Sequence, residues 1–105
     1  MAGHAGFRKL LDELWELHLK KEADYGLGGY SFANVRAASD FGVPAWVGAM
    51  IRANDKMSRI KSFLQNGRLN NESVEDTLLD LAAHALIALA LRREDQEIEN
   101  SKNLG

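Results

Sequence analysis

The sequence predicts an all-α protein, and its composition carries that prediction. The 105 residues include fifteen Leu and fourteen Ala, but only four Val, four Ile and one Thr. Leu and Ala favour helices, whereas β-branched residues favour strands. The single proline, Pro44, stands where a helix can begin. We therefore expect three long helices plus a short one, in a helical bundle that oligomerisation completes.

The overall composition limits the classes of function. With 46% hydrophobic residues and a mass of 11.6 kDa, the chain is expected to form one domain, residues 1–105. It has no Cys, which excludes disulfides, thiolate zinc sites and cysteine nucleophiles. The net charge of −2 argues against nucleic-acid binding. No apolar run is long enough to cross a bilayer and no signal peptide is recognisable, so we expect a cytoplasmic protein without a membrane partner.

The first helix is expected from about Gly6 to Glu22. Its apolar residues recur at helical spacing: Phe7, Leu10, Leu11, Leu14 and Leu17. The next segment, 23–42, combines glycines with aromatic residues, and long loops of this kind are often functional. Within it we expect a short helix from Ser31 to Ser39, ended by Gly42.

The second helix is expected to begin with Pro44 as its first residue and to end at Asn66-Gly67. Its apolar stripe consists of Trp46, Met50, Ala53, Met57, Ile60 and Leu64. A group of charged residues shares another side of the same helix: Arg52, Asp55, Lys56 and Arg59. One acid among three bases makes a poor metal site alone, so this side needs acids from another helix to complete one.

The third helix is expected to start after a cap at Asn71 or Ser73 and to reach about Glu99, with residues 100–105 frayed. It carries two apolar stripes. The first comprises Val74, Leu78, Leu81, Ala85 and Ala88, and the second Leu79, Ala82, Leu86 and Leu89. A helix that is apolar nearly all round must be buried nearly all round. Two other helices are too few for that, so we expect a homodimer or homotetramer.

Asp80 is the residue that does not fit an apolar helix. An ionised carboxylate in such a setting needs a partner. Four polar residues spaced by four share its face: Glu72, Asp76, Asp80 and His84. Acids placed together suit Mg²⁺ or Mn²⁺, with Asp55 as a further oxygen ligand and Lys56 and Arg59 left for phosphate oxygens. The alternative is a structural ion pair between Asp80 and Arg52, Lys56 or Arg59.

Three segments together resemble a known family. They are KEADYG (Lys21 to Gly26), RANDKMSR (Arg52 to Arg59) and ESVEDTLLDLAAHA (Glu72 to Ala85). Their order and spacing resemble the MazG-like all-α nucleoside triphosphate pyrophosphohydrolases. More narrowly, they are similar to the nucleotide modification associated domain, a branch often carried by bacteriophages. If the gene is of phage origin, the expected location is the cytoplasm of the host.

The resemblance implies a Mg²⁺-dependent enzyme that is a dimer or tetramer and that cleaves a nucleoside triphosphate to monophosphate and pyrophosphate. Asp80 matches the final Asp of the family's ExxD motif, whereas the preceding helix offers Asp55 and no ExxE, so the number of metal ions stays open. The implied metal ligands are Asp55, Asp76, Asp80 and Glu72, with Asp24 as an alternative for the missing acid. The implied catalytic residues are Asp80, Asp76 and Lys56. The implied nucleotide-binding residues are Lys21, Asp24, Tyr25, Asn34, Lys56 and Arg59.

The chemistry of the residues agrees with that implication. Cleavage of a phosphoanhydride needs cations on the phosphate oxygens and a positioned water, but no protein nucleophile. The expected substrate is a nucleoside triphosphate, with a deoxynucleotide as the first candidate, and no residue decides the base. The competing hypothesis is a non-catalytic helical module, binding nucleotides or proteins, whose acids form structural ion pairs.

Overall fold

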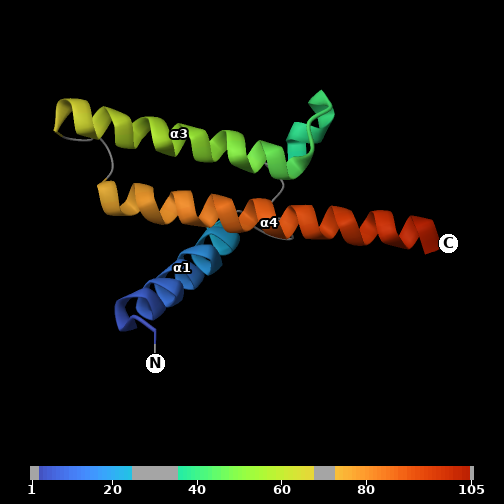
Figure 1. Cartoon of the computed structure of the whole chain (residues 1–105), viewed down its shortest axis with the longest axis horizontal. Helices are drawn as coiled ribbons and strands as arrows, with labels where there is room; N and C mark the ends of the chain where they lie inside the picture. The colour runs from blue at the N-terminus through green and yellow to red at the C-terminus, as the bar shows by residue number, and fades with distance from the viewer. Residues whose placement is uncertain (1–2, 25–35, 68–72, 105) are drawn as a thin grey trace. The chain divides into compact units, whose positions relative to one another are not determined.

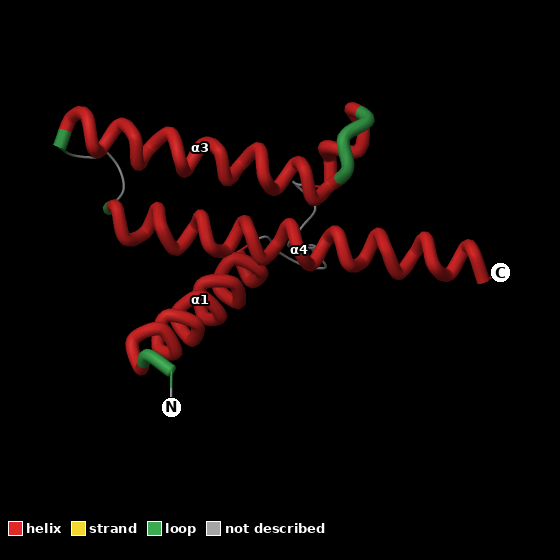
Figure 2. Tube along the Cα trace, in the orientation of Figure 1, coloured by secondary structure: helices red, strands yellow, loops and turns green. Residues whose placement is uncertain are grey.

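The chain is all-helical in the computed structural model, which describes residues 3–24, 36–67 and 73–104. The helices are α1 (Ala5–Asp24), the 3₁₀ helix η1 (Ala37–Phe41), α3 (Ala45–Asn66) and α4 (Val74–Leu104) (Figure 1). No strand occurs among the described residues, as the red tube of Figure 2 makes plain, so the predicted fold class is confirmed. None of the described helices is long and apolar enough to span a membrane.

By its internal contacts the chain divides into two compact units, Met1–Ala33 and Asn34–Gly105. The first contains α1, which matches the first predicted helix to within two residues at each end. His4 precedes α1 and caps it, because its Nδ1 accepts a hydrogen bond from the backbone N–H of Phe7 at 3.1 Å. Five large apolar side chains of α1 are exposed: Phe7, Leu10, Leu11, Trp15 and Leu19.

In the second unit, glycines end two helices where the sequence predicts it. Gly42 follows η1 with φ of 79°, and Gly67 follows α3 with φ of 77°. Both lie in the left-handed region, where a side chain would be strained, and the N–H of Gly67 donates to the carbonyl of Phe63 at 2.7 Å. The predicted cap of the short helix, Ser31, lies outside the described residues.

The start of α3 differs slightly from the prediction. Pro44 has ψ of 144° and is the cap residue, so α3 begins one residue later, at Ala45. The carbonyl of Pro44 accepts hydrogen bonds from Val47 and Gly48, at 3.0 and 3.2 Å. Pro44 therefore opens the helix without belonging to it, because its carbonyl already joins the helical hydrogen-bond pattern while its backbone is still extended.

The start of α4 is capped by Ser73, one of the two predicted caps. Its Oγ accepts a hydrogen bond from the backbone N–H of Asp76 at 3.0 Å; the other candidate, Asn71, lies outside the described residues. The predicted end near Glu99 is wrong, since α4 continues to Leu104. No Gly or Pro interrupts the helix before that point, and Lys102 in the last turn favours the helix dipole.

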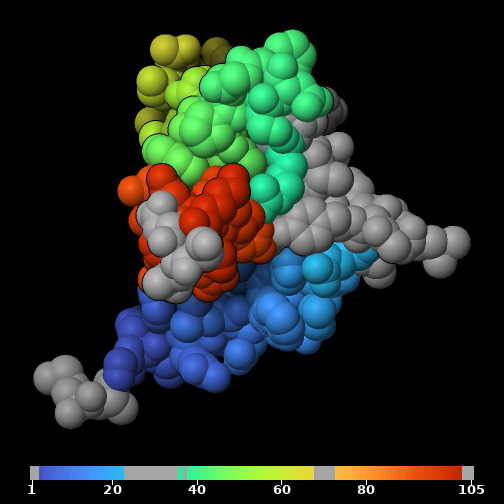
Figure 3. Space-filling view, turned by 90° about the vertical axis from the view of Figure 1, so that its right-hand side faces the viewer, coloured from blue at the N-terminus to red at the C-terminus, as the bar shows by residue number. Residues whose placement is uncertain are grey.

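Helices α3 and α4 pack side by side and antiparallel. Figure 1 shows the first part of α3 (green) beside the middle of α4 (orange), and the turned view of Figure 3 shows green residues of α3 against orange and red residues of α4. The seam is made largely of small residues. The buried residues of α3 are Ala45, Gly48, Ala49 and Ala53, and those of α4 are Thr77, Ala88 and Leu91. Small side chains allow two helices to approach closely, which explains why α3 and α4 meet along the faces that carry these residues.

The predicted apolar stripe of α3 therefore packs on α4 only in part. Of its six residues only Ala53 is buried, while Met50, Met57 and Leu64 are exposed. The face of α3 that is buried against α4 also includes small residues beside the stripe, namely Ala45, Gly48 and Ala49. Spacing alone identified an amphipathic helix, but side-chain size decided which side of it contacts α4.

Candidate functional site

The candidate site is a half-buried ion pair between α3 and α4. The Nζ atom of Lys56 lies 3.2 Å from Oδ2 of Asp80, and each side chain is 18% exposed. Lys56 stands on the contact face of α3, three residues after Ala53 and four before Ile60. Most of the Lys56 side chain is covered while its ammonium group meets the carboxylate, as is usual for a lysine with a long apolar stem. Lys56 is therefore the cationic partner that the sequence analysis expected for Asp80, and it is one of the three bases named there.

Polar groups around the pair are satisfied by the backbone of α4. Nδ1 of His84 donates to the carbonyl of Asp80 at 2.7 Å. The buried hydroxyl of Thr77 donates to the carbonyl of Ser73 at 3.1 Å. No buried side-chain nitrogen or oxygen in the described part of the chain lacks a hydrogen-bond partner. The site is thus a closed polar contact in which Asp80 already has a cationic partner.

The other predicted acids do not gather around Asp80. Asp55 lies on α3 and Asp76 in the first turn of α4, and both are exposed. Within the described ranges, no three His, Cys, Asp or Glu side chains form a group that fits a metal ion. Mg²⁺ takes six ligands, usually including one or two carboxylates, so the described residues do not by themselves fit it while Lys56 holds Asp80. Glu72 lies outside the described residues.

The predicted nucleotide-binding residues fall into three groups. Lys56 and Arg59 stand on α3, where Arg59 is exposed and also takes part in an interaction. Lys21 lies near the end of α1 and is half-buried within a separate unit. Asp24 is the last residue of α1, and its side chain is not described. Tyr25 and Asn34 lie outside the described residues.

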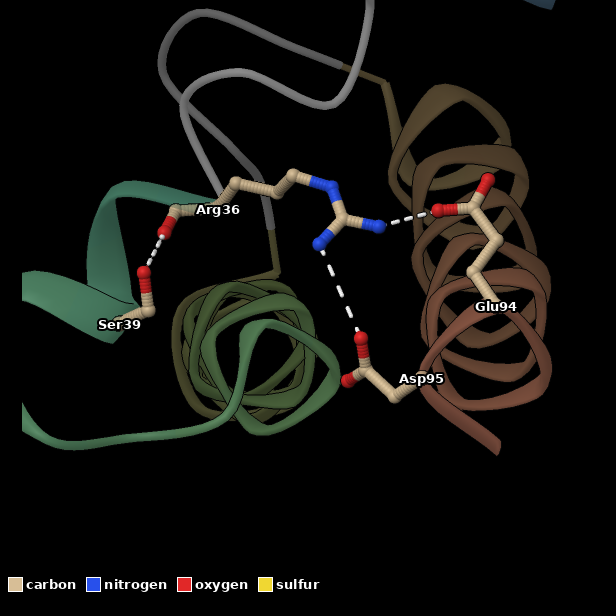
Figure 4. A network of polar contacts seen from close by, with 4 residues as sticks. All are labelled: Arg36, Ser39, Glu94 and Asp95. Atoms are coloured by element: carbon tan, nitrogen blue, oxygen red, sulfur yellow. Dashed lines mark hydrogen bonds and ion pairs between the residues drawn. The ribbon is translucent and has the colours of Figure 1, made fainter. Parts of the chain in front are cut away.

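Sequence reasoning missed a second polar network, which joins the start of the second unit to α4. The guanidinium group of Arg36 bonds to Oε2 of Glu94, and its Nη1 lies 3.8 Å from Oδ1 of Asp95 (Figure 4). The carbonyl of Arg36 accepts a hydrogen bond from the hydroxyl of Ser39 at 2.8 Å. No spacing signals this network, because it depends on which turn of α4 lies opposite the residues before α3.

A cation–π contact lies on the same part of the seam. The guanidinium carbon of Arg92 stands 5.4 Å from the ring centre of Trp46. The Arg92–Trp46 contact and the Arg36 network together connect α4 to the first turn of α3 and to the segment before it. These contacts use arginines, and they account for charges that the sequence analysis had left without a role.

The chain matches no family model, no curated protein and no solved structure.

Proposed function

We propose that the protein is a Mg²⁺-dependent nucleoside triphosphate pyrophosphohydrolase that acts on the nucleotide pool, with a deoxynucleotide as the expected substrate. One observation carries the proposal: a carboxylate and an ammonium group are held 3.2 Å apart in an otherwise small and apolar seam. Charged groups kept from water at a defined spacing are costly for stability alone and are common at functional sites. The similarity of three sequence segments to the MazG-like enzymes supports the reaction.

In this proposal the protein binds and orients the triphosphate. Lys56 and Arg59 lie three residues apart on α3, so they are neighbours on its surface and both suit phosphate oxygens. Asp80, Asp76 and Asp55 are the proposed acids for Mg²⁺ (Mn²⁺ as substitute), together with Glu72. Such an ion, when bound, neutralises charge on the phosphates. Asp80 would hold such an ion only in place of its present contact with Lys56, whose ammonium group would then suit a phosphate oxygen.

The proposal predicts release of pyrophosphate and monophosphate. The experiment incubates the purified protein with each of the eight common ribo- and deoxynucleoside triphosphates in Mg²⁺ or Mn²⁺ and separates the products by ion-exchange chromatography. Asp80→Asn should abolish the activity. Asp95→Asn is the matched control, because it makes the same chemical change on the same helix at a residue that contacts Arg36 instead. Absence of pyrophosphate with every nucleotide, or equal loss in both variants, contradicts the proposal.

The second candidate is a non-catalytic helical module, and the ion pair itself favours it. A lysine that neutralises Asp80 leaves the fold without need of a metal ion, as a structural ion pair requires. The two candidates differ in the response to Mg²⁺. Under the enzyme proposal, Mg²⁺ at ten times its Kd stabilises the wild type by about 1.4 kcal/mol, and Asp80→Asn removes that gain. Under the alternative, melting curves in Mg²⁺ and in chelator coincide for both proteins.

A further inference from the structure

The side of α4 that points away from the α3 seam carries an exposed apolar strip. The strip consists of Leu78, Ala82, Ala85, Leu86 and Leu89. Its three leucines, Leu78, Leu86 and Leu89, are 50%, 53% and 45% exposed. Successive members lie mostly three or four residues apart, so they share one side of α4. This spacing is typical of a helix that packs along another helix.

Opposite charges stand at the two ends of the strip. Glu75 comes three residues before Leu78, and Arg93 comes four residues after Leu89, so both continue the same side of the helix. Both side chains are exposed. Glu75 and Arg93 are also equally far from residue 84 along the sequence. The strip with its two ends is therefore complementary to itself when one copy is turned end for end.

We propose that α4 pairs with α4 of a second copy in an antiparallel dimer whose twofold axis passes near residue 84. In this arrangement Leu78 packs near Leu89 of the second copy, and the alanines at the centre let the two helices approach closely. Each Glu75 meets Arg93 of the second copy, about 13 Å along the helix from the axis. A symmetric contact of this kind uses one surface twice, as closed dimers do. A parallel pairing would place Glu75 against Glu75 and Arg93 against Arg93.

The inference deepens the oligomeric state expected under the proposed function and rests on that part of it alone. It is independent of nucleotide hydrolysis, because mass and helix orientation are measured without substrate. An inactive protein that pairs in this way would contradict the enzyme proposal and leave the dimer standing. An active protein with another interface would do the reverse.

Charge reversal tests the pairing of the two ends. Analytical ultracentrifugation of the wild type should give a mass of about twice 11.6 kDa. Glu75→Arg and Arg93→Glu should each raise the dissociation constant roughly tenfold, because each variant replaces two attractive contacts by two repulsive ones. The double variant, which carries both changes, should restore wild-type association. Glu99→Arg is the matched control, since it reverses an exposed charge of α4 beyond the strip and should leave association unchanged.

Cysteine cross-linking tests the orientation directly, because the chain has no Cys of its own. In the proposed dimer the two copies of residue 85 differ by about 3 Å along the helix axis, so Ala85→Cys should form a disulfide-linked dimer under mild oxidation. Gln96→Cys lies on the same side of α4, but its two copies would be about 36 Å apart and should not cross-link.

The outcomes separate the possible occupants of the strip. Cross-linking through residue 85 alone, with rescue by the double charge variant, supports the antiparallel dimer. Cross-linking through both cysteines indicates a parallel pairing and overturns the proposal. A monomeric wild type also overturns it and assigns the strip to another part of this chain or to a different protein. Charge variants that associate like the wild type show that the copies meet through another surface.

Discussion

The two sides of α4 differ in the size of their apolar side chains: the buried side carries mostly small residues, whereas the exposed side carries three leucines. The side that contacts α3 contains small and polar residues, including Thr77, Asp80 and Ala88, with Leu91 as its one fully buried large apolar residue. The opposite side carries three leucines, and each is close to half exposed. In a self-sufficient helical hairpin the leucines would be expected at the contact.

The difference shows that the two sides contribute by different means. The α3 side provides close helix packing and a specific ion pair, both of which fix how two helices of one chain are aligned. The exposed side provides apolar area that gives no stability until something covers it. Each of the following predictions changes one side or one attachment and compares the result with a matched position, from the largest expected effect to the smallest.

Truncating a leucine should have very different effects on the two sides. Leu91→Ala should lower the free energy of unfolding by about 3 kcal/mol, because the fully buried side chain leaves a cavity. Leu86→Ala should lower the stability of the protomer by less than about 1 kcal/mol, because half of that side chain is already in water. Urea denaturation at a concentration where the protein is monomeric measures both. Equal losses would mean that the two sides are equally covered in solution.

Removing one partner of the ion pair should be the next largest effect. Asp80→Asn in chelator should cost roughly 2 kcal/mol, because it leaves the half-buried Lys56 without its countercharge. Lys56→Met should cost a similar amount, and the combination with Asp80→Leu should recover most of it. A double-mutant cycle from thermal unfolding provides the coupling energy. Additive losses would contradict a direct contact between the two side chains.

Removing the cap of α4 should have an intermediate effect. Ser73→Ala deletes the acceptor for the N–H of Asp76 and should cost about 1 kcal/mol. Ser73→Asp should preserve stability, because aspartate caps helices equally well. Ser101→Ala, at an exposed position within the helical C-terminal part of α4, serves as the control and should change little. Chemical denaturation of the three variants decides whether the cap contributes as the geometry indicates.

Breaking the Arg36 network should have the smallest effect. Arg36→Ala should cost about 0.5 kcal/mol, because the arginine and both acids are more than one third exposed and water screens the interaction. The loss should shrink further in 1 M salt. Glu97→Ala, at an exposed acid of the same helix, is the control. A loss as large as that of Asp80→Asn would show that this network, rather than the Lys56 pair, aligns the two helices.

Much of the candidate site depended on distances that no sequence pattern contains. The pattern of α4 identified Asp80 as an acid in need of a partner and named Lys56 among three bases on α3, which is the pairing found. It also suggested that Asp55 and Asp76 would join them, and among the described residues they do not gather. The four-residue spacing places acids on one face of one helix, but it does not fix how a second helix is rotated about its axis.

The sequence by itself determined the helical class and the helix ends at Gly42 and Gly67, and it narrowed the cap of α4 to Asn71 or Ser73. These features are local: a propensity, a positive φ or a side chain within one turn decides each of them. The tertiary structure alone decided which side of α3 meets α4, why three leucines of α4 stay exposed, and that Arg36 reaches Glu94. Those outcomes depend on how closely two helices approach, and small side chains such as Ala49 and Ala53 control that distance only once both helices are present.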